Sequence, residues 1–164
     1  MKTHEEYMEL ALEEARKAEE IDEVPVGCVI ICDGEVISRG HNLKEQLNQA
    51  YAHAEMMAIQ KAAEVKGNWC LNDCDLYVTL EPCMMCTGII NLSRIRSVYY
   101  GTTDSKGGCL ETVIDLKKIN RLNHYPNIVG NILQKECAEI LTNYFRKKRE
   151  ITKEKKQKNK ANIQ

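Results

Sequence analysis

Residues 76–86 of the 164-residue chain have the sequence LYVTLEPCMMC. The first five are apolar or β-branched, which predicts a strand over residues 76–80. Pro82 predicts the first turn of a helix, because proline fits that position and its missing amide hydrogen is not needed there. Residues 83–92 are very apolar, so this helix is expected to pack against the strand. The strand and the helix form the centre of the predicted fold.

The residues before this centre show both helix and strand patterns. Apolar residues at helical spacing predict a helix over residues 5–20. Residues 26–32 are almost continuously apolar, which predicts a strand covered on both faces. Asp33-Gly34 predicts a two-residue hairpin turn into a second strand over residues 35–40, because both residues tolerate a positive φ. A hairpin therefore precedes the central strand.

Helix and strand patterns also alternate through the rest of the chain. Residues 41–52 are polar and irregular, whereas residues 53–65 predict an apolar helix that Gly67 ends. After the central strand and helix, the predicted elements are a strand over 97–100, a loop with weak helical content over 104–123, a strand over 128–129 and a helix over 132–149. The expected fold class is α/β: a three-layer α/β/α domain with a central mixed five-stranded sheet.

Two motifs at the starts of the apolar helices suggest metal chemistry: His53-Ala54-Glu55 and Pro82-Cys83-Met84-Met85-Cys86. Two thiolates one turn apart at a helix N-terminus and one imidazole make three ligands for zinc. Three ligands leave a position open for water, which the metal acidifies. Glu55 is then expected to carry protons rather than to bind the metal. The pattern predicts a catalytic zinc site.

Neither motif is specific to such a site on its own. A Cys-x-x-Cys pair also occurs in thioredoxin-like redox proteins and in half of a zinc finger, and a lone buried histidine is more often a core residue. Together, His-x-Glu followed by Pro-Cys-x-x-Cys is the pattern of zinc deaminases. The combination therefore favours the catalytic interpretation.

Other cysteines and several methionines lie outside the set of ligands that the two motifs provide. Cys28 and Cys32 lie on one face of a predicted strand, two pleats apart, and are expected to be small core residues. Cys70 and Cys74 flank a turn and could bind a metal, but nothing nearby completes a ligand set. The methionines beside the two motifs are expected to fill the core beneath the metal: Met56, Met57, Met84 and Met85.

Length and composition predict a single domain with one core. No apolar run approaches the ~18 residues of a membrane span, and the N-terminal residues lack the apolar segment of a signal peptide. We therefore expect a cytoplasmic protein without a membrane partner. Its eight cysteines are expected to be thiols or metal ligands, because the cytosol keeps disulfides reduced.

The net charge of −1 conceals a strong asymmetry. Residues 146–160 contain nine Lys and Arg residues and two acidic residues, Glu150 and Glu154. This segment therefore carries a net charge of +7, and the rest of the chain carries −8. A basic end on an acidic body predicts contact with a polyanion, usually nucleic acid. The alternative is a solvated, frayed helix end. We divide the chain into a zinc-dependent domain over residues 1–149 and a basic C-terminal tail over residues 150–164.

Over residues 5–149 the chain resembles the bacterial tRNA-specific adenosine deaminases of the cytidine-deaminase-like superfamily. Besides the zinc motifs, four blocks lie at matching intervals: VPVG (24–27), GHN (40–42), YVTLEPC (77–83) and FRKKR (145–149). The last block and the Asn123-His124 pair favour the tRNA branch. The chain departs from the family at QAYA (49–52), where DPTA is usual, and in the loop TTDSKGGC (102–109).

The resemblance implies a homodimeric hydrolase that converts adenosine to inosine at the wobble position of a tRNA anticodon. It implies one Zn²⁺ per subunit, held by His53, Cys83 and Cys86, with Glu55 as the catalytic proton carrier. The anticodon stem-loop would be bound by further residues: Asn42 on the flipped base, Val24 and Leu80 as walls of its pocket, and Asp104, Lys106, Asn123, Phe145 and Arg149 on the RNA. Val24 and Leu80 could instead be plain core residues, and Asp104 could merely cap a turn.

Two other functions stay open at this point. A free-base or nucleoside deaminase acting on guanine or cytosine would share the zinc centre, although a small neutral base needs no basic tail. An RNA-binding module with a structural zinc would need a fourth protein ligand near Cys83 and Cys86, and the sequence offers none at suitable spacing.

Overall fold

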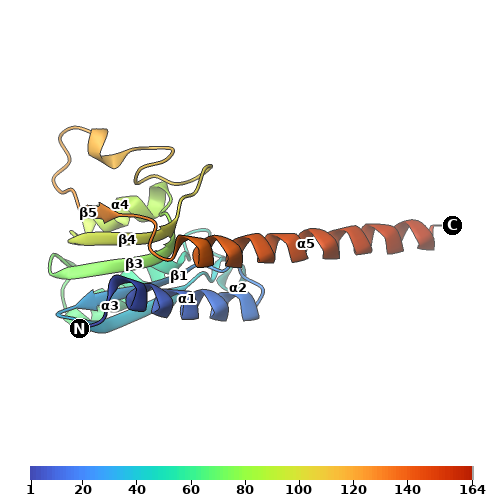
Figure 1. The fold of residues 1–164 in the computed structure, drawn as a ribbon, viewed down its shortest axis with the longest axis horizontal. Coiled ribbons are helices and arrows are strands. Elements are labelled where there is room, and N and C mark those ends of the chain that lie inside the picture. Colours follow the sequence, from blue (N-terminus) through green and yellow to red (C-terminus); the bar gives the residue numbers. More distant parts are fainter. Residues whose placement is uncertain (164) are drawn as a thin grey trace.

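A five-stranded sheet with the strand order β2-β1-β3-β4-β5 forms the centre of the computed structural model, which describes residues 1–163 (Figure 1). β1 pairs antiparallel with β2 and β3, whereas β4 pairs parallel with β3 and β5. The mixed five-stranded sheet is therefore confirmed. The strands are β1 (Gly27–Cys32), β2 (Glu35–His41), β3 (Cys74–Leu80), β4 (Ser97–Thr102) and β5 (Asn127–Val129).

Helices cover both faces of the sheet, which confirms the three-layer α/β/α prediction (Figure 1). On one face, α1 and the first part of α5 pack against Val29, Ile31 and Tyr77. On the other face, α3 and α4 pack against Ile30 and Leu76. β1 lies between the two layers, so all of its residues are buried, as its apolar sequence predicts. The helices are α1 (His4–Glu20), α3 (Ala54–Lys66), α4 (Met84–Leu92) and α5 (Gln134–Asn162).

The connections on either side of β2 differ in how well the sequence predicts them. Asp33 and Gly34 close the β1–β2 hairpin with φ values of 50° and 80°, which confirms the predicted two-residue turn. The segment after β2 is polar, but it is not wholly irregular, because it contains the one-turn helix α2 (Lys44–Leu47). So short a helix leaves no apolar periodicity to detect.

The start of α3 is positioned on the sheet by a close approach to β2. A Cβ atom at Gly40 would lie 2.4 Å from the carbonyl oxygen of Ala54 and 2.7 Å from the amide nitrogen of Ala58. Glycine is needed here because any side chain would force the helix away from the strand. The approach therefore fixes how far the first turn of α3 stands from the sheet, and that turn follows His53.

The last helix is longer than predicted. α5 continues to Asn162 instead of ending near residue 149, because residues 150–162 contain no Gly or Pro and are rich in the helix formers Lys, Glu and Gln. Lys148 pairs with Asp22 at 2.6 Å, and beyond this contact the exposed helix projects past the body (Figure 1). The division at residue 149 stays a prediction, although no break in the helix marks it. Among residues 1–163, no helix is both long and apolar enough to cross a membrane.

β3 begins at Cys74, two residues earlier than predicted, and Cys70 and Cys74 flank the turn at residues 72–73, as predicted. One packing prediction is wrong. The four methionines do not fill the core: Met84 is 68% exposed, and Met56, Met57 and Met85 are half-buried. α4 turns other residues toward the sheet, and its buried positions are Cys86, Thr87 and Ile90. Cys28 and Cys32 are buried, as predicted.

Candidate metal and substrate site

Three potential metal ligands meet where two helices begin at one end of the sheet. His53 is the N-cap residue of α3, Cys83 is the N-cap residue of α4, and Cys86 lies in the first turn of α4. His53 Nδ1 lies 3.5 Å from Cys83 Sγ and 3.6 Å from Cys86 Sγ. All three ligand atoms lie within 4.8 Å of one another. The structure thus brings together the three residues that the sequence predicts as zinc ligands.

These distances fit a tetrahedral ion of the size of zinc. Bonds of about 2.3 Å to sulfur and 2.0–2.1 Å to nitrogen give a tetrahedral N···S edge of about 3.5 Å. Both distances from His53 Nδ1 match that edge. Among residues 1–163, no fourth His, Cys, Asp or Glu atom joins the group. A set of three protein ligands is typical of catalytic zinc sites, whereas structural sites normally have four.

The electrostatic surroundings of Cys83 favour the thiolate that zinc requires. The pKa of the Cys83 thiol is lowered to about 4, because Cys83 accepts a hydrogen bond from Cys86 and another from His53, and these contacts outweigh its burial. Its place at the N-terminus of α4 acts in the same direction, since the helix dipole favours negative charge there. Cys83 is therefore prepared to bind a cation.

Glu55 lies beside the ligand group without belonging to it. Its side chain is 4% exposed, and its Oε2 accepts a hydrogen bond from Cys86 Sγ at 3.4 Å. Burial raises the pKa of Glu55 to about 7. A carboxyl group with that pKa can both take up and release a proton near neutral pH, which general acid–base catalysis requires.

A cavity of about 190 Å³ opens directly onto the ligand group. It is smaller than the ~300–1,000 Å³ typical of sites for drug-sized ligands, so its size suits one planar base. The resemblance implies Asn42, Val24 and Leu80 at a base pocket, and the structure places these three in the cavity, together with Asp104. The lining residues are Val24, Val26, Asn42, Lys44, His53, Ala54, Glu55, Leu80, Glu81, Cys83 and Asp104.

Asn42 is the polar group of the cavity that is best placed to recognise a base. Its Nδ2 donates to the carbonyl oxygen of Val24 at 3.3 Å, and its Oδ1 accepts from the amide of Lys44 at 3.1 Å. A primary amide has two N–H donors and two acceptor sites, so one of each remains free for a ligand. Because both existing contacts hold the amide in place, its free groups have a fixed direction.

The comparison with known families agrees with this geometry. A model of the cytidine and deoxycytidylate deaminase zinc-binding region matches residues 1–102. That span contains the three potential ligands, Glu55 and most of the cavity lining. The chain belongs to this deaminase family. The zinc-dependent hydrolase predicted from the two motifs is thereby confirmed at the level of the family.

The deaminase is also similar over most of its length to proteins named tRNA-specific adenosine deaminase. The one from Bacillus subtilis is 46% identical over 150 residues, which cover 92% of this chain and 91% of that protein. The one from Agrobacterium fabrum is 47% identical over 148 residues, covering 90% and 96%. The resemblance predicted from the sequence blocks is confirmed.

Two solved structures show how the fold is shared within the family. A chain from a study of A-to-I editing by tRNA:A34 deaminases at the wobble position has a TM-score of 0.80 and 46% identity, and the match covers 83% of this chain and 99% of that one. A guanine deaminase from Bacillus subtilis has a TM-score of 0.60 and 30% identity, with 73% and 87% covered. The cytidine-deaminase-like fold is therefore confirmed, and both substrate classes that the sequence left open occur on it.

Glu81 organises one wall of the deaminase cavity, a role that the sequence analysis did not predict. Its carboxylate accepts hydrogen bonds from the amides of Leu110, Glu111 and Thr112 and from the Thr112 hydroxyl. Burial alone would raise the pKa of Glu81. The hydrogen bonds, of which that from the Thr112 hydroxyl has the largest effect, outweigh burial and lower this pKa. The buried carboxylate therefore anchors the loop after β4. Its partners lie about thirty positions along the chain, so no local pattern could reveal them.

Asp104 caps a turn, one of the two roles that the sequence left open, and its predicted contact with RNA stays a prediction. It lines the cavity, and its Oδ1 also caps a turn by accepting from the amides of Lys106 and Gly107 at 3.1 and 3.2 Å. Lys106 itself is exposed at the tip of this turn and does not line the cavity. Both residues lie on the loop that Glu81 holds, so the position of the loop tip depends on that buried carboxylate.

A second, wider cavity of about 490 Å³ adjoins the first and shares Val24 and Lys44 with it. Phe145 and Lys148 of α5 form its other side. Phe145 is half-exposed and lines this second cavity, next to the base-sized one. We call the two cavities the base pocket and the α5 groove.

Two predicted RNA contacts lie apart from these cavities. Arg149 is exposed on α5, one turn beyond Phe145. Asn123 is exposed in the loop before β5, whose first residue pairs with Ser97 at the start of β4. The base pocket lies near the opposite ends of β3 and β4, so the structure does not bring Asn123 to the pocket.

Proposed function

We propose that this protein is a tRNA-specific adenosine deaminase, which hydrolyses adenosine to inosine at position 34, the wobble position, of a tRNA anticodon. Relatives with that name at 46–47% identity support the proposal, as does the similar structure from a study of tRNA:A34 deaminases. The observation that carries it is the junction of the base pocket with the α5 groove. A free base would fill the pocket alone, whereas a nucleotide within an RNA needs room for its neighbours.

We assign the zinc site to His53, Cys83 and Cys86, with one catalytic zinc in each subunit. When bound, zinc supplies an activated water for hydrolysis near neutral pH. Glu55 would take a proton from the attacking water and deliver it to N1 of adenine, and would then protonate the departing ammonia. Addition of water at C6 and loss of ammonia leave inosine. The short distance between Glu55 and the ligand group supports this role.

The remaining groups of the base pocket hold the adenine. The free N–H and the free acceptor site of Asn42 are available to the base edge, while Val24 and Leu80 enclose its faces and exclude water. Phe145 lies where it can stack on a neighbouring base, and Lys148 lies beside it in the same groove. Lys106 and Arg149 are exposed cations suited to phosphates, and Asn123 would meet a more distant part of the tRNA.

The substrate test compares an anticodon stem-loop carrying adenosine at the wobble position with free adenosine, guanine and cytidine. We expect inosine in the stem-loop and little turnover of the free compounds, because only the RNA fills the α5 groove. Deamination of free guanine at a higher kcat/KM than the stem-loop would favour the rival function, which the 30% identical guanine deaminase represents.

Removal of a metal ligand is expected to abolish binding of the catalytic zinc. In Cys83→Ala, two ligands cannot hold the ion through extensive dialysis, so metal analysis should give about one zinc fewer per chain than in the unmodified protein. The control is Cys70→Ala, which removes a thiol outside this ligand group. Full zinc occupancy in Cys83→Ala would exclude Cys83 as a ligand.

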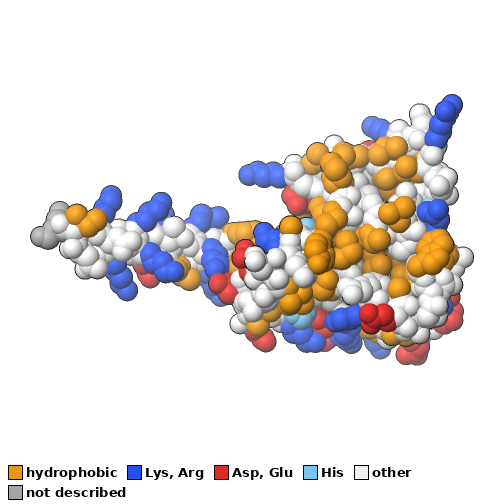
Figure 2. Space-filling view, turned by 180° about the vertical axis from the view of Figure 1, so that it is seen from behind, with side chains coloured by type: hydrophobic (Ala, Val, Ile, Leu, Met, Phe, Trp, Pro, Cys, Tyr) orange, Lys and Arg blue, Asp and Glu red, His pale blue; other side chains and the backbone are white. Residues whose placement is uncertain are grey.

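We also propose that the protein is a homodimer in the cytoplasm. Figure 2 shows the side of the molecule that α3 and α4 cover, where hydrophobic side chains gather. Trp69 is 66% exposed and Leu92 is 64% exposed, and with Met56, Ile59 and Ile89 they line an almost entirely apolar hollow. Large exposed apolar surfaces are typical of interfaces. A second copy of this face would cover it.

A charge on this apolar face is expected to produce monomers. Leu92→Arg would place an unpaired cation in the proposed interface, which is unfavourable because burial removes its hydration. The matched control is Ile151→Arg, which alters a half-exposed apolar residue on the projecting part of α5. Light scattering coupled to size exclusion should give a dimer mass for the unmodified protein and the control. A monomeric unmodified protein at micromolar concentration would contradict the proposal.

A further inference from the structure

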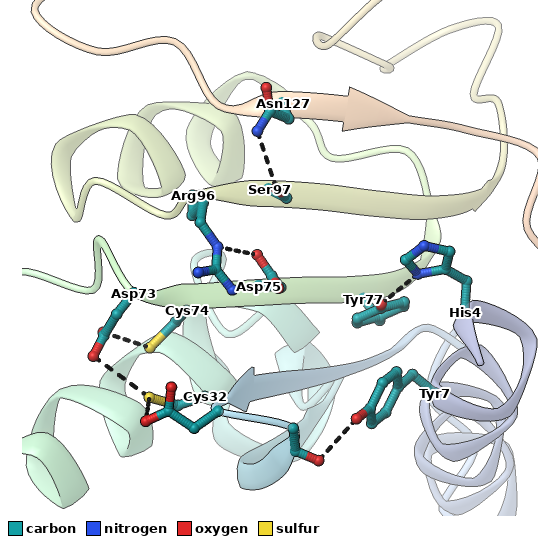
Figure 3. A network of polar contacts seen from close by, with 12 residues as sticks. His4, Tyr7, Cys32, Asp73, Cys74, Asp75, Tyr77, Arg96, Ser97 and Asn127 are labelled. Atoms are coloured by element: carbon teal, nitrogen blue, oxygen red, sulfur yellow. Dashed lines mark hydrogen bonds and ion pairs between the residues drawn. The ribbon is translucent and has the colours of Figure 1, made fainter. Parts of the chain in front are cut away.

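Two cysteines from different strands lie side by side at the other end of the sheet. Cys32 ends β1 and Cys74 begins β3, and the two residues are direct partners in the antiparallel register. Asp73 precedes Cys74, and Figure 3 shows its carboxylate beside both sulfur atoms. The catalytic zinc ligands lie near the opposite end of β3, six residues or about 20 Å away along the strand. The cluster is therefore separate from the base pocket.

Each sulfur lies about one tetrahedral edge from an oxygen of Asp73, Cys32 from Oδ2 and Cys74 from Oδ1. Cys32 Sγ lies 3.5 Å from Asp73 Oδ2, and Cys74 Sγ lies 3.4 Å from Asp73 Oδ1. Zinc bonds of about 2.3 Å to sulfur and 2.0–2.2 Å to oxygen give a tetrahedral S···O edge of about 3.5 Å. One atom from each residue can be chosen so that all three lie within 4.8 Å of one another. The cluster therefore meets the same geometric criterion as the catalytic ligand group.

The surrounding charges are suited to a divalent cation. A bound metal would displace the protons of both thiols, and the resulting two thiolates and one carboxylate would carry three negative charges, of which a divalent ion would neutralise two. Lys66 Nζ lies 2.5 Å from Asp73 Oδ2 and 3.5 Å from Cys32 Sγ, so its ammonium can neutralise the third. Such a contact also orients the carboxylate, as groups around metal ligands commonly do. Asp33 Oδ2, 3.9 Å from Cys32 Sγ, is a further carboxylate oxygen on the same side of the cluster as that sulfur.

We propose that Cys32, Cys74 and Asp73 form a second metal site, for a thiophilic divalent cation of the zinc class. Sulfur ligands select zinc over magnesium and calcium, which prefer oxygen. The Asp73 side chain is 44% exposed, so the ion reaches the buried sulfurs from solvent on that side. A bound ion would join the end of β1 to the start of β3, next to the C-terminal end of α3, where Lys66 stands. Its role is to stabilise this end of the sheet, away from the chemistry.

The test is a zinc titration of the full chain with its catalytic zinc in place, under a phosphine reductant that keeps the thiols free. Equilibrium dialysis should find one further zinc per chain, and added zinc should raise the Tm. Cys74→Ser should lose the further zinc and the rise in Tm. Cys70→Ser, which removes a nearby thiol outside the cluster, should keep both.

Asp73→Asn provides a second variant, because the Asp73 side chain is half-exposed and asparagine of nearly the same size leaves no cavity in the core. We expect the Kd of the further zinc to rise at least about tenfold, the lower end of the effect of losing a group that supports a metal. Deamination in both variants should equal that of the unmodified chain, which separates this site from the catalytic one. Absence of further zinc binding in the unmodified chain, or unchanged binding in Asp73→Asn, would overturn the proposal.

Discussion

The Glu55→Gln variant should retain zinc and bind tRNA normally, yet deaminate it about 10²–10⁴-fold more slowly, or slower still because one group serves several proton transfers. Glutamine has nearly the shape of glutamate but cannot take up and release a proton at neutral pH. The Glu55 side chain is buried beside Cys86 and the base pocket, so a change of similar size should leave both intact. The reaction would lose its proton carrier while the site keeps its form.

Single-turnover kinetics on a wobble-adenosine stem-loop would measure the chemical step, with metal analysis and tRNA binding measured on the same preparation. The matched control is Glu64→Gln, which changes an exposed glutamate on the same helix and should leave the rate unchanged. Loss of zinc together with activity would identify Glu55 as a metal ligand instead. An unchanged rate with zinc in place would show that another group carries the proton.

The metal ligands could be predicted because each of them is fixed by local structure. A residue at a helix N-terminus projects its side chain and its amides toward one point, so Cys83 and Cys86 converge whatever the rest of the fold does. His53 needs only that α3 begin beside α4. The sheet arranges this, and the close approach at Gly40 sets the depth of α3. The catalytic ligand group can therefore be predicted from local sequence patterns.

Contacts between distant segments could not be predicted in the same way. The pairing of Cys32 with Cys74 depends on the register of β1 and β3, and Glu81 depends on a loop about thirty residues away. The exposed side of α4 could not be predicted because the helix is apolar almost all round, and hydrophobicity alone does not determine which residues face the sheet. Tertiary structure decides these positions.

Removal of the chain after Glu150 should weaken tRNA binding and reduce its dependence on salt, without changing the catalytic zinc. The cut removes five lysines: Lys153, Lys155, Lys156, Lys158 and Lys160. Each lost phosphate contact lowers the slope of log affinity against log salt by roughly 0.7–0.9. The anchor of α5 lies before the cut, where Lys148 and Tyr144 contact Asp22, so Phe145 should stay at the α5 groove.

The helical structure of this segment shows which of these lysines should matter. From Phe145, steps of four, four, three and four residues lead to Arg149, Lys153, Lys156 and Lys160, and such steps keep all five side chains on one face of α5. Phe145 borders the α5 groove, so this basic stripe continues outward from the place where the anticodon would lie. Residues 150–162 would extend it by about 20 Å beyond the anchored part of the helix.

Two full-length variants can therefore distinguish RNA binding along this basic stripe from non-specific electrostatic attraction to the helix. Replacing Lys153, Lys156 and Lys160 with glutamine should reproduce most of the loss caused by the truncation, including the lower salt slope. Replacing Lys155 and Lys158, which lie on other faces of the helix, should lower the affinity much less. An equal loss of tRNA affinity per replaced lysine in the two variants would indicate non-specific electrostatic attraction. If the truncated protein keeps the affinity and salt slope of the full chain, the segment is a solvated helix end, and the phosphate contacts must come from the body and the first part of α5.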